Sequence, residues 1–235
     1  MVMRRFIFLL FCLMPLAQLA SAAGVDAVVR AFDTRYQRAR TLKAIFFESY
    51  QDGKGGVSAD SGTVYFSRPG RMRWDYESPE QKLFLVDGTN VWFYVPADHT
   101  VSRAKLSQSS DWRTPLALLA GKTDLGKLCR RIEPADSIQA GSTQPDAATT
   151  PPGTTTLRCV PREGPESESI QDVLLGIDPE GFLVRILVRQ PGNASTEFRF
   201  GNWEENLAIP EAKFHFEPPP GVAVVDEQAL ADTLR

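Results

Sequence analysis

The stretch Arg68–Tyr94 reads RPGRMRWDYESPEQKLFLVDGTNVWFY, and it decides how the rest of the chain is organised. Its first part alternates apolar with charged residues, and the apolar members are Met72, Trp74 and Tyr76. This period of two is typical of a strand with one apolar face. Apolar runs lie on both sides of Asp87-Gly88, a pair that favours a hairpin turn because glycine accepts a positive φ. The stretch therefore predicts three antiparallel strands that form a wall rich in aromatic side chains.

The amino terminus reads as an export signal that is removed from the mature protein. Arg4 and Arg5 precede the apolar run 6–16, which is too short to span a bilayer comfortably. Ala20-Ser21-Ala22 has the small-residue pattern of a cleavage site. We expect cleavage after Ala22, which leaves residues 23–235 as a single domain. An uncleaved membrane anchor is the alternative.

Composition and motifs argue for a binding protein. Removing Arg4 and Arg5 from 26 basic residues leaves 24 against 29 acidic ones, a net charge of about −5 with no basic stripe for nucleic acid. The two histidines, His99 and His215, are far apart, and no metal-ligand spacing or nucleophile motif is present. We therefore expect no enzymatic activity, no metal and no other cofactor.

The remaining pattern predicts a mainly β fold with two helical segments. An apolar stripe at helical spacing indicates a first helix over Gly24–Leu42. Short strand-like runs between turn residues then predict about ten or eleven mostly hairpin-connected strands. The expected strands are Ala44–Tyr50, Ser61–Ser67, the three strands of the opening stretch, Thr100–Leu106, Leu157–Val160, Ile170–Ile177, Phe182–Arg189, Ser195–Trp203 and Lys213–Phe216. Leu125–Ile132 is expected as a strand or strand-like piece, and Val222–Asp226 as a short edge. The fold class is a curved antiparallel sheet, an unclosed β-barrel, with an α-helical lid.

The lid is expected in the middle of the chain, where the strand pattern breaks. Thr114 and Pro115 have the cap and first-position chemistry of a helix start, and Gly121 ends the segment. Between them lie the apolar residues Leu116, Leu118 and Leu119. A helix that is apolar all round must be buried or must cover a cavity. A plug in an ordinary core is the alternative.

Several strand positions near the opening stretch are apolar on both faces, which suggests an internal apolar cavity. A sheet with one wet face would alternate, whereas the runs 83–86 and 91–95 do not. Two apolar faces must both be shielded from water, and the expected helices can shield at most part of this surface. An ordinary sandwich core is the alternative. The candidate cavity residues are Phe46, Phe66, Met72, Trp74, Tyr76, Leu85, Trp92 and Tyr94.

Two cysteines remain in the mature chain, and they flank a low-complexity segment. Cys129 and Cys159 can form one disulfide in an exported protein, the alternative being two buried thiols. The segment 134–156 contains almost no large apolar residue. It cannot bury enough surface to offset its ordering entropy, so we expect a disordered surface loop.

The chain resembles the LolA family of periplasmic carriers of outer-membrane lipoproteins in Gram-negative bacteria. The motifs are R-P-x-x-x-R-W at Arg68–Trp74, L-x-D-G-x-x-x-W-x-Y at Leu85–Tyr94, T-P-L-A-L-L-A at Thr114–Ala120 and F-x-F-x-P-P-x-G-V at Phe214–Val222. The resemblance implies an unclosed barrel whose lid covers an apolar cavity for the acyl chains of lipoproteins. It also implies a periplasmic chaperone that carries lipoproteins from the inner to the outer membrane.

The resemblance further implies roles for particular residues and partners. Arg68 matches an arginine that hydrogen-bonds backbone carbonyls of the lid, Pro115–Ala120 here, and Met72 matches a residue at the cavity mouth. The implied partners are acylated lipoproteins, an inner-membrane lipoprotein-releasing ABC transporter and an outer-membrane lipoprotein receptor, with the carrier itself a monomer. Arg71 and Arg73 are expected to make the cavity edge basic. A lipid- or envelope-stress-sensing protein on the same fold is the alternative function.

Overall fold

The computed structural model describes residues 17–106, 119, 124–135, 151–162 and 169–226, and side chains from residue 24 onward. One sheet of twelve strands runs in the order β12-β6-β5-β4-β3-β2-β1-β11-β10-β9-β8-β7. Every neighbouring pair is antiparallel except β12 and β6. The strands are β1 Thr41–Gln51, β2 Val57–Ser67, β3 Arg71–Ser78, β4 Lys82–Val86, β5 Asn90–Val95, β6 Thr100–Lys105, β7 Cys129–Pro134, β8 Thr155–Pro161, β9 Asp172–Ile177, β10 Leu183–Arg189, β11 Ser195–Glu205 and β12 Ala223–Asp226. The unclosed antiparallel sheet predicted from the sequence is thereby confirmed, with twelve strands.

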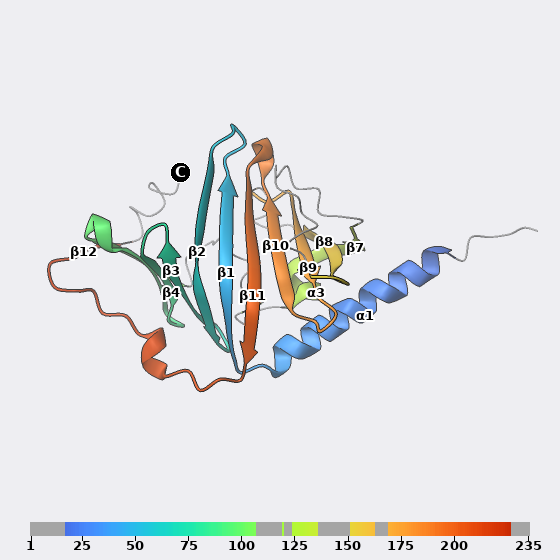
Figure 1. The fold of residues 1–235 in the computed structure, drawn as a ribbon, viewed down its shortest axis with the longest axis horizontal. Coiled ribbons are helices and arrows are strands. Elements are labelled where there is room, and N and C mark those ends of the chain that lie inside the picture. Colours follow the sequence, from blue (N-terminus) through green and yellow to red (C-terminus); the bar gives the residue numbers. More distant parts are fainter. Residues whose placement is uncertain (1–16, 107–118, 120–123, 136–150, 163–168, 227–235) are drawn as a thin grey trace, which may run out of the picture.

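Figure 1 shows how the other elements lie around this sheet. The long strands β1, β2 and β11 stand in the middle, with β3–β6 on one side and β7–β10 on the other. Helix α1, Ala17–Arg38, runs along the half of the sheet that carries β7–β10. The chain leaves β11 and passes through the short 3₁₀ helix η5, Glu211–Phe214, before it reaches β12 at the opposite edge. The two halves of the sheet therefore have different covers.

Helix α1 packs on the sheet through the apolar stripe that the sequence predicts. Phe32 and Tyr36 are 1% and 2% exposed and belong to the main core. The helix ends at Arg38, earlier than expected, because Leu42 pairs with Phe66 of β2 and with Glu205 of β11 and is therefore strand. The expected cleavage site after Ala22 lies inside the first turns of α1. Cleavage there stays a prediction.

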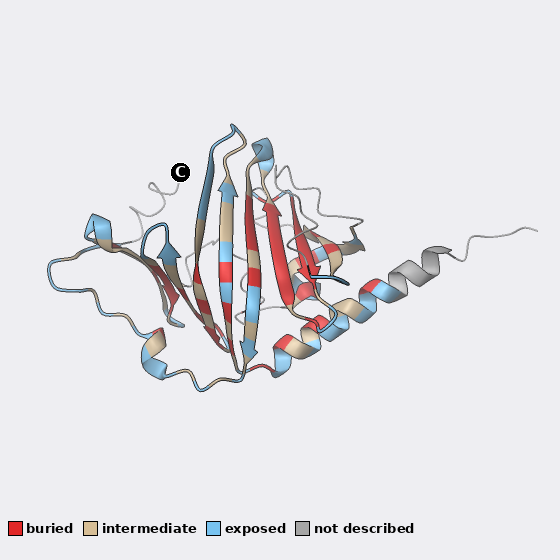
Figure 2. Cartoon of the chain, in the orientation of Figure 1, coloured by how far each residue is buried: buried red, intermediate tan, exposed pale blue. Residues whose placement is uncertain are grey.

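Strands β4, β9 and β10 bury both of their faces, whereas Ile45 and Phe47 of the central strand β1 stay exposed on one face (Figure 2). One face, called here the inner face, carries the main apolar core, to which α1 contributes. The opposite, outer face carries a smaller core of Leu83, Leu85, Trp92, Val101 and Phe214. Because successive strand residues point to opposite faces, the continuous apolar run of β4 serves both cores.

The outer core is covered by the segment between β11 and β12. Phe216 lies over the rings of Trp92 and Tyr94, at centroid distances of 5.7 Å and 5.4 Å. The strand expected at Lys213–Phe216 is wrong, because Glu211–Phe214 forms η5 and no ladder continues through residue 216. Phe214 and Phe216 alternate because both rings pack against the sheet, although their backbone is not paired with a strand.

The segment expected as one strand over Leu125–Ile132 is divided into two elements. Asp124 caps a short helix, α3 Leu125–Leu128, by accepting a hydrogen bond from the backbone N–H of Lys127 at 2.8 Å. Strand β7 begins only at Cys129, whose sulfur is joined to that of Cys159 on β8 in a disulfide. The expected loop 134–156 is shorter at both ends, since Pro134 belongs to β7 and Thr155 and Thr156 to β8. Residues 136–150 lie outside the described part of the chain.

A buried carboxylate ties together three strands of the β7–β10 half. Asp172 of β9 is 0% exposed and accepts hydrogen bonds from Arg158 of β8 at 2.7 Å and from Arg189 of β10 at 2.6 Å. Burial alone would raise the pKa of Asp172, but the hydrogen bonds from Arg189 and Arg158 outweigh it and lower the pKa. A charged group at this depth is tolerable only because both arginines compensate it.

We expect Asp172→Asn to lower the free energy of unfolding at neutral pH by about 3 kcal/mol, because two arginines would lose their counter-charge. The folded-state pKa is below the ordinary 3.8, so the contribution of Asp172 is complete above 3.8 and is lost as pH falls through the lowered value. Urea unfolding from pH 7 to pH 2.5 should therefore show the difference between the two proteins shrinking at the acid end. Asp226→Asn, at an exposed ion pair with Arg103, is the control and should change little. A constant difference across this range would contradict the assignment.

The disulfide makes a second prediction about stability. The double variant Cys129→Ser/Cys159→Ser should unfold with about 3–4 kcal/mol less free energy, because the bridge closes a loop between cysteines 30 residues apart. Reduced wild type should match the variant in its urea midpoint. Equal midpoints for oxidised and reduced wild type, with two thiols open to alkylation in both, would refute the bridge.

Candidate functional site

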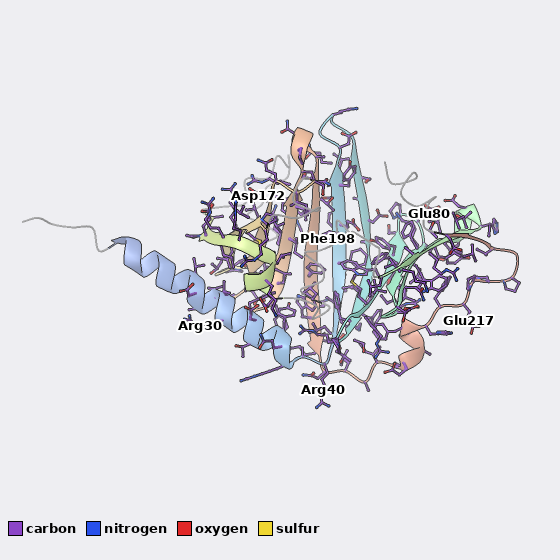
Figure 3. All side chains as sticks on the ribbon, turned by 180° about the vertical axis from the view of Figure 1, so that it is seen from behind. Arg30, Arg40, Glu80, Asp172, Phe198 and Glu217 are labelled. Carbon is purple, nitrogen blue, oxygen red and sulfur yellow. A yellow bond between two sulfur atoms is a disulfide. The ribbon has the colours of Figure 1, made fainter. Side chains whose placement is uncertain are left out.

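The inner face is built around Trp74 of β3, whose indole is 1% exposed. Rings from three neighbouring strands stand around it at steep angles. The ring centroids of Phe46, Phe66, Phe198 and Phe200 lie 4.7, 6.2, 5.5 and 6.0 Å from that of Trp74. Edge-to-face contacts of this kind stabilise an aromatic cluster beyond the area that it buries. The result is an aromatic wall at the middle of the sheet, where Figure 3 labels Phe198.

Polar groups mark one boundary of this wall. Tyr76, two residues after Trp74, packs its ring on Phe46 at 5.0 Å. Its hydroxyl donates a hydrogen bond of 2.8 Å to Glu48 of β1. The ammonium of Lys82 lies 5.3 Å from the centroid of the Tyr76 ring. The apolar face therefore changes here into a half-exposed, charged rim.

Helix α1 closes the other side of the inner face. Tyr36 accepts a hydrogen bond from the backbone N–H of Leu183 at 3.0 Å, and burial raises its pKa, so the hydroxyl stays neutral. Trp203 packs against Tyr36 and Phe66 and donates its indole N–H to the carbonyl of Leu183 at 3.0 Å. These contacts fix α1 on the sheet and satisfy the polar groups at that border.

Arg68 stands just beyond the end of β2, with Phe66 of the inner face two residues before it. Its backbone N–H donates to the carbonyl of Arg40 at 2.9 Å, which holds the turn against the end of α1. Burial lowers the pKa of the guanidinium, yet an arginine stays charged at neutral pH. Its Nη1 is buried and has no hydrogen-bond partner among the described residues. A charged donor in this state is available to an acceptor that comes close.

Of the expected lid, only Leu119 falls within the described residues. It is fully buried in the same core cluster as Phe66 and Trp74. Pro115, Leu116 and Leu118 lie outside the described part of the chain. The contact between Arg68 and lid carbonyls therefore stays a prediction.

The structure separates the eight expected cavity residues into two groups. The inner face brings together Phe46, Phe66, Met72, Trp74 and Tyr76. Leu85, Trp92 and Tyr94 belong to the outer core, so their expected place in the same cavity is wrong. The register explains the split. Leu85 pairs with Trp92, and the inner positions of the same hairpin are Phe84 and Val86.

Asp87 of the D-G turn has a structural task on this hairpin. Its carboxylate accepts hydrogen bonds from the backbone N–H groups of Thr89 and Asn90, both at 2.7 Å, and from the indole of Trp92 at 2.8 Å. Burial would raise the pKa of Asp87, but these hydrogen bonds outweigh it and lower the pKa. The D-G-x-x-x-W motif therefore fixes the β4–β5 turn.

The expectation that Arg71 and Arg73 make the cavity edge basic is also wrong, because both lie on the outer face. Arg71 binds Glu211 of η5 through both of its terminal nitrogens. Arg73 donates to Asp75 at 2.7 Å and to the carbonyl of Lys213 at 3.1 Å. The alternation in β3 thus separates an apolar face from a polar strip that anchors η5.

Sequence reasoning missed two members of the aromatic wall, Phe198 and Phe200 of β11. The run S-T-E-F-R-F alternates and could have identified them, since two phenylalanines two residues apart share one face of a strand. Their neighbourhood with Trp74 depends on the pairing of β1 with β11, which joins segments far apart in the chain.

Other kinds of site are not supported by the part of the chain that the structure describes. It contains no cluster of three or more metal-ligating side chains. None of its helices combines the length and the apolar character needed to cross a membrane. A cleft of about 460 Å³ lies where α1 meets the end of β11, but most of its lining residues are charged or polar, and Arg35 is bridged there to Glu205 at 2.9 Å. The inner face carries the largest apolar cluster among the described residues, and this makes it the candidate binding surface for an apolar ligand.

Comparisons with known proteins identify the relatives of this chain. Residues 37–217 match the family model described as outer membrane lipoprotein carrier protein LolA. An outer-membrane lipoprotein carrier protein of Nitrosospira multiformis is 31% identical over 194 residues, which make up 81% of this chain and 84% of the relative. One from Nitrosomonas europaea is 31% identical over 227 residues, or 95% and 99% of the two chains. A solved structure of an uncharacterized conserved protein from Thermus thermophilus aligns with a TM-score of 0.51 at 10% identity, covering 87% of this chain and 99% of that one, and supports the fold alone.

The two faces should respond differently to substitution. Phe216→Ala on the outer face should lower the free energy of unfolding by about 2–4 kcal/mol through lost packing, with little effect on an apolar fluorescent probe bound at the inner face. Met72→Gln, nearly equal in volume, should weaken probe binding because it places an amide on the inner face. Chemical unfolding and probe titration measure the two effects. Parallel loss of binding in a folded Phe216→Ala variant would contradict the separation of the faces.

Proposed function

The chain belongs to the LolA family of outer membrane lipoprotein carrier proteins, and from this premise we propose how it performs that task. The acyl chains of a lipoprotein lie against the inner face around Trp74, and the protein carries them from the inner to the outer membrane. It acts as a carrier and not as an enzyme. The observation that supports this most strongly is the family match over residues 37–217, which contain nearly all of the sheet.

The physical need for such a carrier follows from the cost of exposing hydrocarbon. Each exposed CH₂ group costs about 0.8 kcal/mol in water, so one chain of about 16 carbons costs roughly 12 kcal/mol to carry bare. A wall of aromatic rings replaces water around the chain without forming directional bonds to it. Such a surface accepts chains of different length and so suits many lipoproteins.

The place of action proposed is the periplasm, the space that a lipoprotein must cross between the two membranes. The export signal expected at residues 1–22 leads there. A disulfide such as Cys129–Cys159 fits the same compartment, because structural disulfides persist in oxidising surroundings and are rare in the cytosol.

The proposed gate consists of Arg68 and the lid segment 115–120. Arginine suits this task because its planar fork offers five donors and remains charged. The buried, unpartnered Nη1 of Arg68 is in keeping with a donor that exchanges acceptors during the cycle. A lid held by a few such hydrogen bonds has a modest closing free energy, so cargo can enter and leave.

The proposed partners follow from the direction of transport. Acylated lipoproteins are the cargo, an inner-membrane lipoprotein-releasing ABC transporter loads them, and an outer-membrane lipoprotein receptor accepts them. The carrier works as a monomer, since it must shield one cargo at a time and then release it.

The experiment that tests the function is mass spectrometry of the protein purified from the periplasm under native conditions. Intact triacylated lipoproteins bound one to one are expected. Free phospholipid alone would indicate a different lipid-transfer role, and the absence of any lipid would contradict the carrier role.

Arg68 provides the mechanistic prediction. Arg68→Leu should impair cargo transfer to acceptor membranes, because the lid loses its charged donors while an apolar side chain still covers the adjoining core. Arg68→Lys is the matched variant, because it keeps the charge but loses the planar guanidinium group with its five donors. Its transfer rate should lie between those of wild type and Arg68→Leu. A reconstituted transfer assay with a purified lipoprotein measures the rates. Unchanged transfer by Arg68→Leu would remove Arg68 from the mechanism.

A further inference from the structure

Two buried nitrogen donors, one on the inner face and one beside it, have no hydrogen-bond acceptor among the described residues. Among the described residues, buried side-chain nitrogen or oxygen atoms without a hydrogen bond occur in Asp60, Arg68, Trp74 and Arg185. Asp60 is ion-paired with Lys82 at 2.6 Å and Arg185 with Glu197 at 2.7 Å. The atoms that remain are Nη1 of Arg68 and Nε1 of Trp74. Arg68 belongs to the proposed gate, whereas Trp74 lies within the wall itself.

The indole of Trp74 differs in this respect from the other tryptophans that the structure describes. Trp92 donates its N–H to Asp87 at 2.8 Å, and Trp203 donates to the carbonyl of Leu183 at 3.0 Å. Buried indole N–H groups normally find such a partner, because an unpaired donor away from water is unfavourable. Trp74 is instead surrounded by hydrocarbon rings, which carry no lone pair. Packing does not require the N–H group, so this group needs a separate reason.

Within each acyl chain of the proposed ligand, an acceptor of the required kind occurs in one place only. The methylene groups of an acyl chain accept no hydrogen bond, but the chain is joined to its head group through an ester or amide carbonyl. We propose that Nε1 of Trp74 donates a hydrogen bond to this carbonyl oxygen, so that the inner face recognises acyl chains in preference to alkyl chains. The inference rests on the proposed function, because the carbonyl that Trp74 would bind belongs to the acyl chains of the proposed cargo.

This contact would also place the ligand on the sheet. Trp74 pairs with Val64 in the interior of β2, whereas Arg68 stands beyond the end of that strand. A carbonyl bound at Trp74 therefore lies over the middle of the wall, and the chain beyond it runs over the phenylalanine rings of β1 and β11. Hydrophobic contact has no direction of its own, so a single hydrogen bond can fix the position of the chain.

The test combines a change in the ligand with a change in the protein. The probes are 1,2-dioctanoylglycerol and its diether analogue 1,2-dioctylglycerol, which lacks both carbonyl oxygens. Affinities of both are measured by calorimetry for wild type and for Trp74→Phe, which keeps an aromatic ring and removes the N–H group. Trp92→Phe is the matched control, because it removes an indole N–H from the outer face. The double difference cancels the general effects of each change.

Wild type should show an ester-to-ether affinity ratio about fivefold larger than Trp74→Phe, the factor that corresponds to a net hydrogen bond of about 1 kcal/mol. Trp92→Phe should keep the wild-type ratio. Equal ratios in wild type and Trp74→Phe, with both probes bound, would overturn the inference and leave the carrier function intact. Failure of wild type to bind either probe would overturn the function and the inference together.

A second measurement needs no stable Trp74→Phe protein. In wild type labelled with ¹⁵N, the indole N–H resonances are recorded with each probe, and the resonance of Trp74 is assigned by elimination with phenylalanine variants of the other three tryptophans. The Trp74 proton should move downfield with the diester and stay nearly in place with the diether. The same shift with both probes would show that the indole responds to hydrocarbon alone and would refute the contact.

Discussion

The constraint on which this molecule depends is that its sheet is apolar on both faces and only one face can be given to a ligand. The outer face of β4 and β5 is closed by the chain itself, through Phe214 and Phe216 and the ion pairs that hold η5. Without that cover, Leu85, Trp92 and Tyr94 would form an exposed apolar patch, which would compete with the inner face for apolar ligands. With this part of the outer face closed, the inner face is the surface at which we propose that an acyl chain is held.

The faces could be predicted from the sequence only where the strand alternates. In β3 the alternation of Met72, Trp74 and Tyr76 with charged residues assigns the inner face correctly. In β4 and β5 the apolar runs are continuous, so the pattern does not tell which side chains point to the inner face and which to the outer face. The pairing of Leu85 with Trp92 in the structure shows it. A pattern of alternation also misled at Lys213–Phe216. There two phenylalanine rings, two residues apart, pack on the sheet although the backbone of this segment forms no strand.

The candidate site was predictable to a similar extent. Its residue types follow from composition and from a family resemblance, which together pointed to Arg68 and to most of the aromatic wall. The unpaired donors could not be foreseen, because whether an indole N–H finds an acceptor depends on side chains from distant strands. Trp74 and Trp92 lie in similar runs, yet one indole meets four phenylalanines and the other a carboxylate. Only the three-dimensional arrangement distinguishes them.

A carrier must also let its cargo go, and this requirement explains why polar donors belong on an apolar wall. Hydrophobic contact grows with buried area, so a wall that relied on area alone would hold long chains ever more tightly and would not define where a chain lies. A hydrogen-bond donor at a fixed point defines the position of the bound chain. When the cargo leaves, water or another acceptor can replace the hydrogen bond that is lost. In the proposed mechanism, the unpaired donors of Arg68 and Trp74 raise the free energy of the empty carrier, and a bound acceptor relieves it. The hydrogen bond would then fix where the chain lies, while the area that the chain buries still adds to the binding free energy.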